Sequence, residues 1–104
     1  MTRPPLLVVM PAYNEEAALG DVLDELQREL PDVHILVVDD GSDDHTAALA
    51  RSHGAVVAPM PFNSGIGGAL RCGFRYARRH GYPRVVQFDA DGQHDPAEIK
   101  SIVD

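Results

Sequence analysis

Hydrophobic positions along the chain follow two alternating patterns. Four short, nearly continuous apolar runs are rich in Val, Ile and Leu, which is typical of strands covered on both faces. These runs span residues 6–10, 33–38, 55–58 and 85–88. Between them, apolar residues recur every three or four positions, and this spacing predicts helices over residues 15–30, 44–53 and 67–80. The alternation of strand and helix predicts an α/β fold.

Residues with strong preferences for helix ends support these boundaries. Asn14 is expected to cap the first helix and Pro31 to end it. Gly54 and Gly81 stand where the second and third helices should end. Asp95, followed at once by a proline, predicts the start of a fourth helix. Right-handed crossovers then give a mainly parallel, Rossmann-like sheet with helices on both faces, in a single domain over residues 1–104.

The composition narrows the class of protein. Nine basic residues against sixteen acidic ones give a net charge of −7, which argues against nucleic acid as a partner. The single cysteine, Cys72, can form no internal disulfide, which favours a reducing, cytoplasmic setting. No apolar stretch reaches the roughly 20 residues that a bilayer-spanning helix needs, and no signal peptide is recognised.

Polar clusters follow the predicted strands, and in a parallel sheet ligands bind beyond the carboxyl ends of the strands. Asp89 and Asp91 flank Ala90 after the fourth strand, and side chains two apart in an extended segment project to the same side. Paired carboxylates suit Mg²⁺ or Mn²⁺, and Gln93 adds a neutral oxygen nearby. A solvated acidic turn before the next helix is the alternative interpretation.

Two further clusters permit both a structural and a functional interpretation. Asp39 and Asp40 end the second strand, where one carboxylate could accept hydrogen bonds from a nucleoside or both could shape a turn. The glycines of residues 65–68 fit a tight turn into a helix better than a phosphate-binding loop, because no G-x-G-x-x-G pattern is present. A dinucleotide oxidoreductase is disfavoured, because the first strand–helix turn lacks glycines.

With these residues in place, the chain resembles a family 2 glycosyltransferase with the type A nucleotide-sugar-binding fold, in its N-terminal portion. The resemblance rests on four ordered stretches, which read VVMPAYNEE (8–16), LVVDDGSDD (36–44), NSGIGGALRCGFRYA (63–77) and FDADGQHDPAEI (88–99). The last stretch is most similar to the dolichyl- or polyprenyl-phosphate sugar transferase branch.

The resemblance implies a role for several residues and favours Asp40 over Asp39. The positions expected to bind the nucleotide are Pro11, Tyr13, Glu15, Val38, Asp40 and Ala90. The positions expected to hold Mg²⁺ or Mn²⁺ are Asp89, Asp91 and Gln93. It further implies a nucleoside-diphosphate sugar as donor and a polyprenyl phosphate as acceptor, at the cytoplasmic face of a membrane.

Length is where the chain departs from this family. Its members run well beyond 104 residues, and the second half supplies acceptor contacts and the catalytic base, which is therefore expected beyond Asp104. The chain is accordingly interpreted as a truncated nucleotide-sugar-binding domain. A non-catalytic nucleotide-binding fragment, or a remnant that docks on a partner, is the alternative. An incomplete sheet would also expose a strand edge, which favours self-association.

Overall fold

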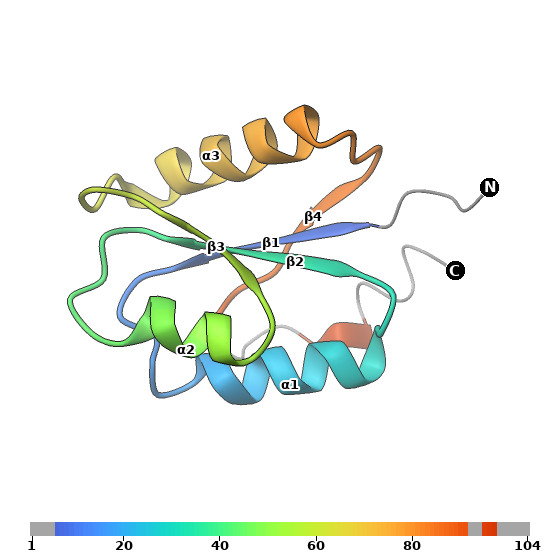
Figure 1. Cartoon of the computed structure of the whole chain (residues 1–104), viewed down its shortest axis with the longest axis horizontal. Helices are drawn as coiled ribbons and strands as arrows, with labels where there is room; N and C mark the ends of the chain where they lie inside the picture. Colours follow the sequence, from blue (N-terminus) through green and yellow to red (C-terminus); the bar gives the residue numbers. More distant parts are fainter. Residues whose placement is uncertain (1–5, 92–94, 98–104) are drawn as a thin grey trace.

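A four-stranded, fully parallel sheet forms the centre of the molecule, with helices on both faces (Figure 1). The computed structural model describes residues 6–91 and 95–97. The strands are β1 (Leu7–Ala12), β2 (His34–Asp39), β3 (Val56–Pro59) and β4 (Val85–Gln87), in the spatial order β3-β2-β1-β4. The helices are α1 (Leu19–Glu29), α2 (Thr46–Ser52) and α3 (Gly65–Arg79). The predicted α/β, Rossmann-like fold is confirmed.

The sheet has an apolar core on each of its two faces. Alternate residues of β1 point to opposite sides, so Val8 packs with the α1 and α2 side while Val9 packs with α3. On the α3 side, Gly73 lies so close to β1 that a Cβ atom there would come within 2.4 Å of Val9 Cγ1. The small residues of α3 therefore let this helix pack directly on the central strand.

The first helix begins later than the sequence predicts. It starts at Leu19 rather than near Glu15, and Ala18 occupies the position before it, so Asn14 is not its cap. Asn14 instead adopts a left-handed conformation with φ of 52°. The chain needs this turn because the backbone N–H groups of residues 14–16 bond to the loop after β2 and to the first residue of α2 rather than entering a helix.

The other helix ends agree more closely with the sequence. Gly54 and Gly81 have φ of 89° and 76°, which confirms them as the left-handed residues that follow α2 and α3. The third helix starts at Gly65, two residues before the predicted start at residue 67. Pro96 and Ala97 are helical, and the remainder of the predicted fourth helix lies outside the described residues. No helix within residues 6–91 and 95–97 is both long and apolar enough to cross a membrane.

Candidate functional site

The candidate site lies along the edge of the sheet where the strands end. Because all four strands run in the same direction, the loops after β1, β2 and β4 meet at this edge, together with the start of α3. Figure 1 shows this edge on the left, where α3 begins and where the loops that follow β1 and β2 lie. The clusters identified from the sequence are therefore brought to one side of the molecule.

The loops after β1 and β2 are joined by reciprocal hydrogen bonds. Asn14 N donates to Ser42 Oγ at 2.9 Å, and Asp43 N donates back to Asn14 Oδ1 at 2.9 Å. Glu15 N donates to Thr46 Oγ1 at 3.0 Å, and Thr46 is fully buried. These bonds fix the backbone of residues 14–15 and so place the neighbouring Tyr13 and Glu15 side chains at the edge.

A second set of bonds ties the same loops at the start of α2. Glu16 N donates to Asp44 Oδ2 at 3.3 Å, while a Glu16 carboxylate oxygen accepts from His45 N at 3.1 Å. Asp44 Oδ1 accepts from Thr46 N at 2.9 Å and from the Thr46 hydroxyl. Burial raises the pKa of Asp44, but the hydrogen bonds from Thr46 and from the Glu16 backbone outweigh it and hold that pKa below its ordinary value.

Asp40 connects the end of β2 to the start of α3. Its side chain is buried, with Oδ1 accepting from Ser64 N at 2.8 Å and from Ser64 Oγ at 2.7 Å. The other oxygen, Oδ2, accepts from Gly65 N at 2.9 Å. A carboxylate in this position satisfies two of the unpaired N–H groups at a helix start and opposes the positive end of the helix dipole. This bonding also explains why α3 begins earlier than expected.

Asp39 has a smaller local role. It is the last residue of β2, and its Oδ1 accepts from Ser42 N at 3.1 Å, which forms the turn expected from its side chain. Both aspartates are thus buried and bonded within the fold. The predicted contact between Asp40 and the nucleoside stays a prediction.

Carboxylates from three loops come close enough to influence one another. Burial raises the pKa of Glu15 above its ordinary value of 4.5, and the negative charges of Asp91 and Asp44 raise it further. The loop after β4 is therefore beside the loop after β1, as the parallel topology predicts. Repulsion among ionised carboxylates at one place is relieved by a bound cation or a shared proton.

The pair predicted to hold a metal lies at the end of β4. Asp89 is half-buried and accepts a hydrogen bond from Gln87 Nε2 at 3.3 Å, while Asp91 is exposed. Ala90, between them, is buried in the core on the α1 side. Gln93 lies outside the described residues. Within residues 6–91 and 95–97, no three His, Cys, Asp or Glu side chains are grouped closely enough to enclose a metal ion.

Hard oxygen donors of this kind nevertheless fit Mg²⁺ or Mn²⁺. Mg²⁺ usually binds through one or two protein carboxylates and completes its coordination with water and substrate phosphates. Two carboxylates on one loop, open to solvent on the Asp91 side, match that partial set of ligands. The residues present are therefore compatible with a metal that is shared with a bound diphosphate.

The remaining predicted nucleotide positions are arranged around the end of β1. Pro11 is half-buried and pairs with Val38 across the sheet. Val38 is fully buried in the core on the α3 side. Tyr13, in contrast, is 43% exposed, so its ring is available to a ligand. Of these three residues, Tyr13 is the one that is exposed at the edge.

Sequence analysis missed the residues that hold these loops in place, namely Ser42, Asp44, Thr46 and Ser64. Each is a hydroxyl or carboxylate residue in the polar stretches after β2 and β3, and such residues commonly bond to backbone N–H groups. The composition of those stretches was therefore a usable signal, but the partners are 24 to 31 residues away in the sequence. Only the folded topology pairs them.

Comparison with known proteins identifies the family of this chain. The sequence profile described as "Glycosyl transferase family 2" matches residues 7–104, which is nearly the whole chain. The chain belongs to glycosyl transferase family 2. It is 40% identical to the polyprenol monophosphomannose synthase of Mycolicibacterium smegmatis over 107 residues, an alignment that covers 94% of this chain and 39% of that protein.

Solved structures of glycosyl transferases share this architecture. The glucosyl-3-phosphoglycerate synthase of Mycobacterium tuberculosis, determined with Mn²⁺, UDP and glucosyl-3-phosphoglycerate, superposes with a TM-score of 0.72 at 28% identity and covers 96% of this chain and 38% of that one. A mannosyltransferase of Pyrobaculum calidifontis, determined with GDP-Man and Mn²⁺, superposes with a TM-score of 0.72 at 26% identity, over 86% of this chain and 28% of that one. The chain thus spans about two fifths or less of the length of these relatives.

Proposed function

We propose that this chain binds the nucleoside-diphosphate sugar for a glycosyl transferase whose acceptor is a polyprenyl phosphate. The observation that carries the proposal is that the loops after β1 and β4 lie at one edge of a family 2 fold, where the negative charge of Asp91 raises the pKa of Glu15. The identity to a polyprenol monophosphomannose synthase supports the class of acceptor. The relatives determined with UDP or GDP-Man support the class of donor.

In this proposal, Asp89, Asp91 and Gln93 hold Mg²⁺ or Mn²⁺ against the donor diphosphate. When bound, the metal neutralises charge on the nucleoside diphosphate as it leaves the sugar. The ring of Tyr13 and the carboxylate of Glu15 line the nucleotide. The hydrogen bonds that Asn14 N and Glu15 N donate to the Ser42 and Thr46 hydroxyl oxygens keep this backbone in position. Asp40 keeps α3 in place and contributes to the nucleoside end of the site.

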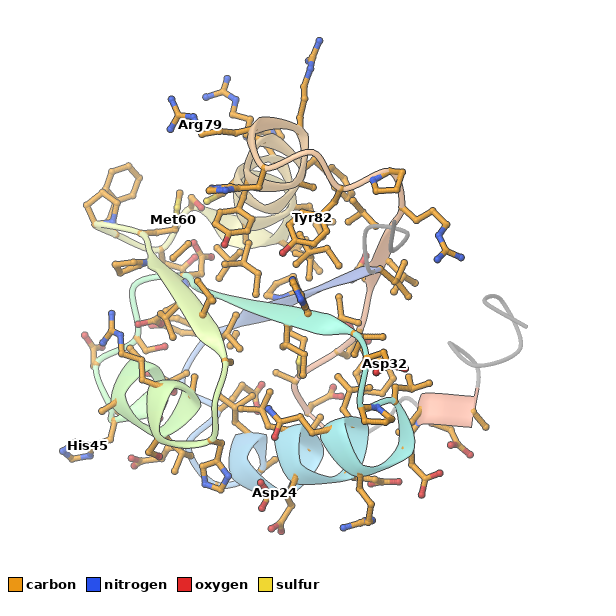
Figure 2. The ribbon with its side chains drawn as sticks, turned by 45° about the vertical axis from the view of Figure 1, so that its right-hand side comes forward. Asp24, Asp32, His45, Met60, Arg79 and Tyr82 are labelled. Carbon is orange, nitrogen blue, oxygen red and sulfur yellow. The ribbon has the colours of Figure 1, made fainter. Side chains whose placement is uncertain are left out.

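Calorimetric titration of GDP-mannose and UDP-glucose, each with and without Mn²⁺, tests this proposal. Mn²⁺ should strengthen binding of at least one donor. Asp91→Asn should weaken the Mn²⁺-dependent binding by about 10–100-fold, as expected when a metal site is impaired. Asp32→Asn is the matched control, because it removes the same charge from the turn between α1 and β2, at the other edge of the sheet (Figure 2). Equal effects of the two variants would refute the assignment.

A further inference from the structure

The helix on one face of the sheet, α3, carries basic side chains and no acidic ones, whereas α1 on the other face is mainly acidic. Residues 45–88 contain no Asp or Glu, although they hold six of the nine basic residues. Four of the six are on α3, and we call them the α3 arginine face: Arg71, Arg75, Arg78 and Arg79. Figure 2 shows Arg79 at the far side of the molecule from Asp24, which belongs to the acidic helix α1. The sheet therefore separates the α3 arginine face from the acidic residues of α1.

The α3 arginine face is directed to solvent. All four arginines are exposed, and Arg71, Arg75 and Arg78 follow the spacing that forms one stripe along a helix. The ion pairs recorded among residues 6–91 and 95–97 both involve histidines, so none of these guanidinium groups has a carboxylate within 4.0 Å there. Because α3 contains four arginines and no acidic residue, its positive charge is not neutralised within the helix, although the whole chain has a net charge of −7.

Apolar surface lies on both sides of this stripe. On one side an open groove of about 900 Å³ has Met60, Cys72 and Tyr76 among its lining residues, with the arginines around them. On the other side Phe74, one turn before Arg78, is 50% exposed. Guanidinium groups beside exposed aromatic and aliphatic atoms are typical of helices that lie in the headgroup region of a membrane.

We propose that the α3 arginine face docks this domain on the surface of a bilayer that contains anionic phospholipid. Arginine binds phosphate oxygens with two parallel N–H groups, so each exposed guanidinium can engage a lipid phosphate. Phe74 enters the interface beside them. In this orientation α3 lies against the lipid, and the edge formed by the strand ends remains open at the side.

The acidic remainder of the molecule does not oppose this docking strongly. The α1 layer lies across the sheet from α3, and each layer is about 10 Å thick. At physiological ionic strength the screening length is about 8 Å, so the carboxylates of α1 are largely screened from the lipid. Their position also orients the domain, since only the α3 side is attracted.

Two other occupants suit this surface less well. A nucleic acid offers phosphates but no apolar phase for Phe74 to enter. A second copy of the chain could place its acidic α1 face here, but such a contact joins unlike surfaces and does not close into a dimer. The proposal rests on the charge distribution and on the exposed apolar surface beside the arginines, and it goes beyond the proposed donor site. Vesicles without polyprenyl phosphate, in the absence of nucleotide, therefore test it separately.

Vesicle binding of the chain provides the test. Binding is measured by co-sedimentation with vesicles of phosphatidylcholine alone and of phosphatidylcholine mixed with phosphatidylglycerol. Each basic residue at an anionic surface strengthens binding by roughly five-fold, so the double variant R75Q/R78Q should weaken binding to the mixed vesicles by about 30-fold. The matched control R28Q/R51Q removes the same charge from α1 and α2 and should change binding by less than about five-fold.

A site-specific readout shows which face meets the lipid. The chain contains no tryptophan, so Phe74→Trp places a single fluorophore on α3, whereas Ser52→Trp places one on α2. The emission of the α3 tryptophan should shift to shorter wavelength with mixed vesicles, and that of the α2 tryptophan should not. Circular dichroism of every variant verifies that the fold is retained.

Four results would overturn the proposal. These are absence of binding to the mixed vesicles, equal binding to neutral vesicles, equal losses in the two double variants, or a fluorescence shift confined to the α2 tryptophan. Sedimentation velocity tests whether a second copy of the chain binds this face, and titration with a short DNA duplex tests whether a nucleic acid does. If R75Q/R78Q dissolves an oligomer, or abolishes DNA binding, while vesicle binding is absent, the face belongs to that partner instead.

Discussion

Replacement of Asp40 by asparagine tests the structural basis of the site most directly. The change keeps the shape of the side chain but replaces one carboxylate oxygen by an NH₂ group, which cannot accept a hydrogen bond. Depending on how the amide is oriented, the oxygen replaced is the one that accepts from Gly65 N or the one that accepts from Ser64. One hydrogen bond to a charged acceptor is lost, at about 1.5–3 kcal/mol, and the remaining bonds become neutral and weaker. Together these losses should lower the free energy of unfolding by about 3 kcal/mol.

Urea denaturation followed by circular dichroism measures this loss. With a denaturant slope of about 2 kcal/mol per molar, the midpoint should fall by roughly 1.5 M. Asp39→Asn is the matched control. Among the described residues the Asp39 carboxylate accepts one recorded bond, from Ser42 N at 3.1 Å, and the amide oxygen of asparagine can still accept it, so the change should cost about 1 kcal/mol or less. Ser64→Ala removes the hydroxyl bond alone and should also cost about 1 kcal/mol. Equal midpoints for the Asp39 and Asp40 variants would show that the cap on α3 is unimportant.

Three further perturbations have definite expected outcomes. Gly73→Ala should cost about 1–3 kcal/mol of unfolding free energy in urea, because its Cβ would lie 2.4 Å from Val9 Cγ1; no change would mean that α3 can move away freely. Thr46→Val should cost about 1–3 kcal/mol, because Glu15 N then loses its buried acceptor, and a neutral result in thermal unfolding would contradict the interlocked loops. The raised pKa of Glu15 means that the folded chain holds this proton more tightly than the unfolded chain, so its contribution becomes unfavourable as the pH rises above 4.5. Glu15→Gln should accordingly be more stable than the parent chain at pH 7 and no more stable at pH 4, and the opposite order would refute the assigned electrostatics.

The elements of the fold were predictable because each rests on a local pattern. Apolar runs located all four strands, and Gly54 and Gly81 marked the residues after two helices. The start of α1 was not predictable in the same way. Asn14 and the two glutamates after it have the residue types of a helix start, but their N–H groups find better-placed acceptors in the loop after β2. Local preference is overridden there by a long-range contact.

The candidate site shows the same division. Its location followed from parallel strands and polar strand ends, and the pairing of Asp89 with Asp91 was visible in the sequence. The structural role of Asp40 was not, because its partners, Ser64 and Gly65, follow a different strand. The family resemblance favoured Asp40 for a functional reason, whereas the described bonds give it a structural one as well. A variant at this position must therefore be examined for folding before its binding is interpreted.

The position of β1 in the sheet has a consequence for the order in which this chain folds during synthesis. The strand β1 is made before the other three described strands but lies between β2 and β4, and Leu7 pairs with Val85 at nearly the opposite end of the described chain. One side of β1 therefore keeps its backbone N–H and C=O groups unpaired until β4 has left the ribosome. Sheets that depend on such distant pairings fold slowly, and exposed strand edges of this kind are prone to aggregate. Nascent chains that end before Val85 should remain protease-sensitive, and protection should arise only when β4 becomes available.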